Sequence, residues 1–145
     1  MTDRPEPYAV PPELEPPLQR LLGIKMSFGP NGEGIAWVDI DREKHFGRTR
    51  VHGGLFPPLV DVAGAIAVAH SSEDALNAVD ATIDMHVSYL RKAREGDLTA
   101  TARIVRRGRR VAVCEVDLTN NGELCGKAIV TYLLQANAKP DPAGG

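Results

Sequence analysis

The stretch that most constrains the fold of this chain runs from residue 51 to residue 69 and is almost wholly apolar after a glycine turn. Pro57 and Pro58 suit the first turn of a helix, where a missing N–H costs nothing. A helix of about four turns that is apolar on all sides is a buried helix, because no face is left for water. We therefore expect the chain to build its core around this helix.

One carboxylate, Asp61, interrupts the apolar run. A carboxylate on a buried helix is costly unless it is hydrogen-bonded, paired or used in chemistry. One interpretation is structural, with backbone amides at the helix start satisfying the side chain. The other is that Asp61 is a functional group.

Length and composition set the broad class. The chain has 145 residues, 43% of them apolar and 25% charged, with a formal net charge of −2. These values are ordinary for one globular domain and give no global reason to expect nucleic acid. We find no signal-peptide core and expect no membrane span, so we expect a cytoplasmic protein.

Three regions differ in composition. Residues 1–17 hold six of the eleven prolines and predict an extended arm. Residues 18–135 are predicted to form a single domain, and residues 136–145 a flexible tail. Cys114 and Cys125 are interpreted as buried thiols, and no metal site is expected, because ligand-type partners are not clustered near them.

Six strands are predicted, at residues 24–28, 35–40, 81–90, 98–105, 111–119 and 124–134. Residues 41–51 predict a loop. Short turns between the last four strands indicate an antiparallel meander that curls around the helix. Because no second helix covers the sheet, its far face and edges need a partner, and we expect an oligomer.

The strand at 81–90 alternates between polar and apolar side chains. Such a pattern is typical of a strand with one buried face. Odd-numbered residues 83–89 are predicted to face the core, and even-numbered residues 82–88 to face away.

Several motifs occur together in this order. The first is His52-Gly53-Gly54, with Asp61 nine positions after the histidine. It is followed by Thr82-Ile83-Asp84-Met85, Ser88-Tyr89-Leu90 and Val113-Cys114-Glu115-Val116. This combination resembles the hotdog-fold thioesterases, in the branch related to the phenylacetate-degradation thioesterases, over roughly residues 20–134. The resemblance implies an α+β hotdog fold, a curled antiparallel sheet of about six strands wrapped around one long central helix.

The same resemblance implies hydrolysis of an acyl-CoA to free acid and CoA, with no cofactor beyond the CoA of the substrate. Asp61 matches the catalytic carboxylate, acting as general base or nucleophile. The backbone N–H of Gly53 matches the oxyanion donor, and the chemistry needs such a donor. Thr82 matches a hydroxyl that holds water, and His52 fixes the turn.

The site is implied to form in a homodimer, or a dimer of dimers, with the glycine turn of one subunit facing Asp61 and Thr82 of the other. Arginine forks bind phosphate well, so the basic turn at 106–110 is assigned to CoA rather than to nucleic acid. A solvated charged hairpin is the alternative. The residues assigned to CoA are Gly54, Tyr89, Leu90, Arg91, Arg106, Arg107, Gly108, Arg109 and Arg110.

The chain departs from its apparent relatives just before the turn. Those proteins usually carry an asparagine six residues before the histidine, where this chain has Phe46. One interpretation places His45 near the position of that asparagine. The departure keeps a second function open, a hotdog domain that binds acyl-CoA without hydrolysing it, as a sensor or carrier. A third is a structural subunit of a larger complex.

Overall fold

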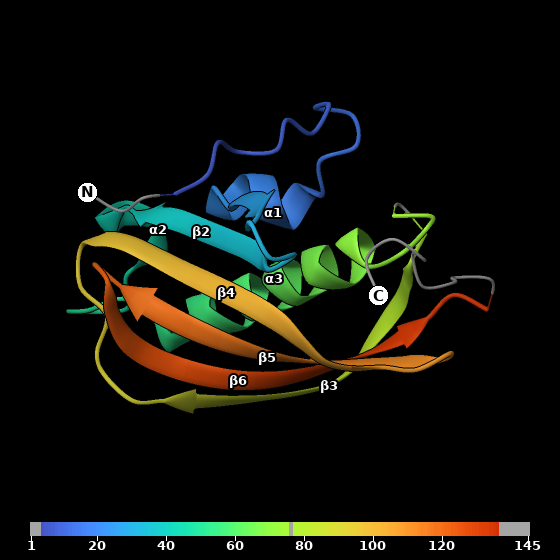
Figure 1. The fold of residues 1–145 in the computed structure, drawn as a ribbon. Helices are drawn as coiled ribbons and strands as arrows, with labels where there is room; N and C mark the ends of the chain where they lie inside the picture. Colours follow the sequence, from blue (N-terminus) through green and yellow to red (C-terminus); the bar gives the residue numbers. More distant parts are fainter. Residues whose placement is uncertain (1–3, 76, 137–145) are drawn as a thin grey trace.

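Helix α3 (Phe56–His70) lies in the hollow of a six-stranded antiparallel sheet, as Figure 1 shows. The computed structural model describes residues 4–75 and 77–136. The helix was predicted from its apolar run, and proline occupies its first turn. Its inner side chains, such as Leu59, Val60 and Val68, are fully buried. Because their apolar surface leaves water, this packing is the main source of stability for the domain.

The sheet has the strand order β1-β2-β4-β5-β6-β3. Its strands are β1 (Lys25–Phe28), β2 (Gly34–Ile40), β3 (Val79–Tyr89), β4 (Gly96–Arg107), β5 (Val111–Asn120) and β6 (Glu123–Leu134). All neighbouring strands are antiparallel. The expected six strands are therefore present, but the expected four-strand meander is wrong. Strands β4, β5 and β6 form a meander, whereas β3 pairs with β6 at the far edge.

Three short helical segments complete the fold. They are α1 (Pro17–Leu22), α2 (Arg42–His45) and the 3-10 turn η1 (Gly53–Leu55). The predicted loop at 41–51 therefore contains a helical turn. Its N-cap is Asp41, whose side chain accepts a hydrogen bond from the Glu43 N–H at 2.8 Å.

His45 is buried at the end of α2 and is used inside the chain. Its Nδ1 accepts from the Asp41 N–H at 2.9 Å, which leaves the proton on Nε2. Nε2 then donates to the Leu22 carbonyl oxygen at 2.7 Å. Both ring nitrogens are therefore occupied by backbone groups, so neither is available to a ligand.

Part of α3 is not covered by the sheet. Pro57, Asp61, Ala65 and Ala69 are half-buried and recur every four residues, so they form one stripe along the helix. By length and composition alone, Gly53–His70 is apolar enough to cross a membrane, although we expected no membrane span from the sequence. Half of it is buried inside the fold, as expected for a core helix.

The proline-rich arm lies against its own chain in the described part, residues 4–16. The Tyr8 N–H donates to the Met26 carbonyl oxygen, and the Ser27 hydroxyl donates to the Glu6 carbonyl oxygen, each at 2.8 Å. The arm thus runs beside β1, the strand at one edge of the sheet. Apart from residue 136, the predicted tail lies outside the described residues.

Candidate active site

The glycine turn before α3 is held by its own histidine. His52 is exposed, and its Nδ1 accepts a hydrogen bond from the Gly54 N–H at 2.8 Å. A Cβ at Gly54 would lie 2.8 Å from that nitrogen, so the imidazole packs there only against glycine. The prediction that His52 fixes the turn agrees with this geometry. The Gly54 N–H is consumed inside the turn and is not free for a ligand.

The Gly53 N–H differs from its neighbour. Among the residues that the structure describes, it donates to no acceptor. It stands at the start of η1, which leads directly into α3, and the first N–H groups of a helix lack internal partners. The positive end of the helix dipole adds to the attraction for an anion at this point. This turn therefore offers one available donor.

Tyr89, at the end of β3, covers the other side of the turn. Its hydroxyl donates to the Gly53 carbonyl oxygen at 2.8 Å, and its ring contacts Phe56 with centroids 5.0 Å apart. The residues around Gly53 and Tyr89 enclose a hollow of about 320 Å³ that also includes Leu90 and Arg91. Three residues assigned to CoA, Tyr89, Leu90 and Arg91, therefore line the same hollow as the candidate oxyanion donor.

Asp61 and Thr82 meet as the resemblance implied. The Thr82 hydroxyl donates to Oδ1 of Asp61 at 2.6 Å. This contact contradicts the predicted orientation of Thr82, because the side chain points to the helix and not away from it. The register of β3 against β6 shifts between Thr82 and Asp84, and such a bulge reverses the alternation of side chains.

Tyr132, on β6, holds the backbone beneath Asp61. Its hydroxyl donates to the Asp61 carbonyl oxygen at 2.6 Å. Burial raises the pKa of Tyr132, and the negative charge of Asp61 raises it further, so the phenol stays protonated and donates. A Cβ at Gly64 would overlap the Tyr132 hydroxyl, which explains a glycine in mid-helix. The sequence analysis did not predict the role of Tyr132. Gly64, three positions after Asp61, was the one signal in the sequence that a large side chain packs against the helix there.

Within one chain the donor and the carboxylate are separated. Gly53 and Asp61 are eight residues apart along η1 and α3, which is about 13 Å at the usual helical rise. A thioester carbonyl needs both groups within about 3 Å of its reacting atoms. One chain alone therefore does not assemble the site.

The two groups of residues assigned to CoA are also separated. The turn after β3 lies at one end of β4, and the basic turn at 106–110 follows the other end (Figure 1). Strand β4 runs from Gly96 to Arg107, a length of roughly 35 Å. The basic turn lies at the same end of the sheet as Thr82, because one cross-strand row joins Arg107, Ala112, Tyr132 and Thr82.

The arginines of the basic turn differ from one another. Arg106, Arg109 and Arg110 are exposed. The three guanidinium nitrogens of Arg107 are instead shielded from water and have no hydrogen-bond partner among the described residues. Burial lowers the pKa of Arg107. Spacing along the sequence gave no signal of this difference.

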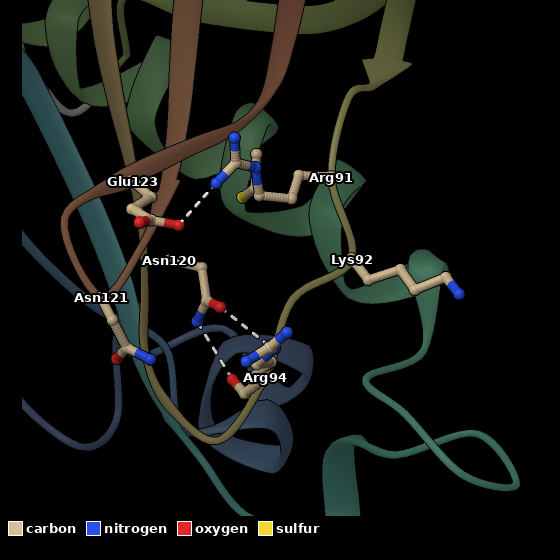
Figure 2. A pocket seen from close by; sticks show the side chains of 7 residues that line it. Arg91, Lys92, Arg94, Asn120, Asn121 and Glu123 are labelled. Atoms are coloured by element: carbon tan, nitrogen blue, oxygen red, sulfur yellow. Dashed lines mark hydrogen bonds and ion pairs between the residues drawn. The ribbon is translucent and has the colours of Figure 1, made fainter.

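A larger hollow, of about 620 Å³, adjoins Arg91 and is shown in Figure 2. It is lined by Arg91, Lys92 and Arg94 from the turn after β3 and by Asn120, Asn121 and Glu123 from the β5–β6 hairpin. Three basic residues and one acidic residue line the hollow, so its net charge favours an anion. The sequence did not predict that Asn120 and Glu123 line this hollow, because their position depends on the contact between two turns.

Both cysteines are buried and free, as predicted. Burial raises the pKa of the Cys114 thiol from 9.0 to about 12 and that of Cys125 from 9.0 to about 11. Neither thiol is therefore a nucleophile near neutral pH.

Comparison with known proteins decides the family. Residues 49–127 match the family model described as "Thioesterase superfamily". The chain belongs to this superfamily. The matched segment contains the glycine turn, α3 and strand β3, which carries both Thr82 and Tyr89. The curled sheet around one helix is the hotdog fold that the resemblance implied.

Two relatives are similar to this chain over part of its length. A putative esterase of Halobacterium salinarum is 47% identical over 72 residues, half of this chain and 47% of that protein. The medium/long-chain acyl-CoA thioesterase YigI of Escherichia coli K12 is 35% identical over 96 residues, 58% of this chain and 62% of that protein. The chain thus spans about half to three fifths of the length of these two relatives.

A solved structure of the thioesterase superfamily agrees with the fold. Zebrafish thioesterase superfamily member 2 superposes with a TM-score of 0.70 at 30% identity. The match covers 84% of this chain and 89% of that one.

Proposed function

We propose that the protein is an acyl-CoA thioesterase that hydrolyses an acyl-CoA to a free acid and CoA. The observation that carries the proposal is the hydrogen bond of 2.6 Å between Thr82 and Asp61 on α3, whose N-terminal turn presents the Gly53 N–H without an acceptor among the described residues. The similarity to a thioesterase named for acyl-CoA supports the substrate class.

We propose that each active site is shared between two subunits paired along β3. This strand ends the sheet, and no strand among the described residues covers its outer edge. Ile83 and Tyr89 on this strand are each 53% exposed, and such an exposed apolar surface at a sheet edge favours contact with another subunit. Two antiparallel copies of β3 centred on His86 would place Thr82 opposite Tyr89 of the partner subunit, because the bulge between Thr82 and Asp84 leaves both residues three paired steps from that point.

This pairing would bring the separated groups together. Asp61 is hydrogen-bonded to Thr82, and Gly53 of the partner subunit is hydrogen-bonded to the partner's Tyr89, so each pair moves together into the interface. The carboxylate of Asp61 then faces the donor that it lacks in its own chain. The half-buried stripe of α3 that carries Asp61 and Ala65 would lie at the same interface.

The proposed chemistry uses these groups in fixed roles. The Gly53 N–H stabilises the oxyanion that forms as the thioester carbonyl is attacked. Asp61 either removes a proton from the attacking water or attacks the carbonyl carbon itself, in which case water then hydrolyses the mixed anhydride and frees Asp61. Thr82 holds the carboxylate in position. The C–S bond breaks, the thiolate of CoA leaves and takes up a proton, and water supplies the new acid oxygen.

CoA is proposed to lie along the smaller hollow at Gly53 and the larger hollow, which share Arg91 and Lys92 in their walls. The smaller hollow would hold the chain next to the thioester, and the basic hollow at Arg91 would hold the phosphates. The exposed arginines of the basic turn, Arg106, Arg109 and Arg110, lie at the Thr82 end of the sheet. They would approach the same CoA from the subunit that supplies Asp61.

Release of free thiol from a panel of aromatic, medium-chain and long-chain acyl-CoAs tests the proposal. The wild type should turn over at least one of them, and Asp61→Asn should lose most of that activity. The protein's own thiols are buried, so they contribute little to a thiol assay. Binding of acyl-CoA without turnover of any would refute the enzyme and favour the non-catalytic binding domain. Full activity of Asp61→Asn would refute the assignment of Asp61.

A further inference from the structure

The basic hollow shown in Figure 2 contains an internal competitor for its ligand. Among the described residues that line it, Glu123 is the only carboxylate. Its Oε2 lies 2.7 Å from a guanidinium nitrogen of Arg91. In Figure 2 the Arg91 side chain reaches toward the β5–β6 hairpin to meet it, whereas Lys92 points away from Glu123.

The walls of this hollow are fixed by backbone contacts. Asn120 accepts from the Arg94 N–H at 2.8 Å and donates to the Arg94 carbonyl oxygen at 3.0 Å. The N–H groups of Leu90 and Arg91 both donate to the Cys125 carbonyl oxygen, at 2.9 and 3.1 Å. The turn is therefore tied to the hairpin on both sides. What can reorient is the Arg91 side chain.

The Arg91–Glu123 ion pair is easily broken. The two side chains are 62% and 69% exposed, and ion pairs in water contribute little stability. A phosphate carries more negative charge than a carboxylate and accepts two parallel hydrogen bonds from a guanidinium. A phosphate that enters the hollow therefore takes Arg91 from Glu123, and Glu123 remains beside it as a like charge.

We propose that Glu123 competes with the phosphate groups of CoA for Arg91 and thereby weakens CoA binding without taking part in the chemistry. The inference rests on the proposed function, since it takes CoA as the ligand. Glu123 is then a determinant of substrate affinity, and ionic strength modulates its effect.

The test compares Glu123→Gln with Glu95→Gln. Glu95 makes an ion pair of 2.6 Å with Arg42, is also exposed, and does not line the hollow, so it is a matched loss of charge. For Glu123→Gln we expect the KM for acyl-CoA to fall about fivefold at low salt, with kcat unchanged. Titration calorimetry with free CoA should show the same tightening. The KM for an acyl-N-acetylcysteamine thioester, which has no phosphates, should not change.

Three results would overturn the inference. The first is an unchanged CoA affinity in Glu123→Gln. The second is an equal gain in Glu95→Gln, which would indicate a general effect of net charge. The third is a full gain from Glu123→Gln in an Arg91→Ala background, because competition requires Arg91. If the wild type and every variant fail to bind CoA, the proposed function itself is wrong, and the inference falls with it.

Discussion

Gly53→Pro removes the single N–H assigned to the oxyanion and leaves the rest of the turn in place. The residue before a proline must be extended, and His52 already is, with φ −68° and ψ 128°. Gly53 opens the short helical turn, where proline is favoured, and its N–H has no partner to lose among the described residues. A Cβ there would lie 3.4 Å from Cε1 of Tyr89, an ordinary contact.

The expected effect is on the chemical step alone. Loss of one oxyanion donor lowers kcat by about 100- to 1000-fold, or about 3–4 kcal/mol of transition-state stabilisation. The KM for acyl-CoA should change little, and the melting temperature should stay close to that of the wild type. Gly53→Ala is the matched control, because it adds the same Cβ and keeps the N–H. It should retain most of the wild-type kcat in a thiol-release assay.

Two outcomes would refute this reasoning. A Gly53→Pro variant that is folded and keeps the wild-type kcat would show that the Gly53 N–H does not stabilise the oxyanion. Equal losses in Gly53→Pro and Gly53→Ala would show that the contact with Tyr89, and not the donor, matters at this position.

Three further predictions follow from single contacts. Thr82→Val keeps the shape but loses the hydrogen bond to Asp61, so it should lower kcat by about 10- to 100-fold, the range set by a hydrogen bond to a charged group. Thr82→Ser, which keeps a hydroxyl, should retain most of the wild-type kcat. Equal activity in both variants would contradict the role of the hydroxyl. Because the Cys114 thiol stays protonated in the folded state to about pH 12 but ionises above pH 9.0 when unfolded, the free energy of unfolding should fall as pH rises from 9 to 12, by at most about 1.4 kcal/mol per pH unit for this thiol. The free energy of unfolding of Cys114→Ala, measured by urea unfolding at each pH, should fall less steeply with pH. An identical fall with pH would contradict the burial of the thiol. Arg107→Met should raise the free energy of unfolding by about 1 kcal/mol in the same assay, because it removes a guanidinium shielded without a partner among the described residues; destabilisation would show that a partner exists.

Local patterns were enough to predict the elements of this fold. The apolar run and the two prolines marked α3, and its observed bounds are Phe56–His70. The sequence Asn120-Asn121-Gly122 between β5 and β6 is typical of a tight hairpin turn, and Asn121 and Gly122 have the left-handed φ values of 51° and 83° that such a turn needs. These signals are carried by neighbouring residues, so they survive without knowledge of the tertiary structure.

The features that the sequence did not predict depend on pairing between strands that are distant in the sequence. The bulge between Thr82 and Asp84 turned Thr82 toward Asp61, although the alternation of residues 82–89 pointed it away. The position of β3 beside β6 depends on how the sheet closes around α3, and not on the turn that follows β3. The resemblance to hotdog thioesterases named both Asp61 and Thr82, but their contact needed the three-dimensional register.

Mixing two inactive variants tests the shared active site most directly. Asp61→Asn and Gly53→Pro each remove one half of the proposed site, on different subunits. A dimer with one copy of each variant would contain one doubly altered site and one intact site, so an equal mixture that exchanges subunits should recover about a quarter of the wild-type activity. Activity no higher than that of either variant alone, with mixed dimers shown to be present by native mass spectrometry, would contradict the account.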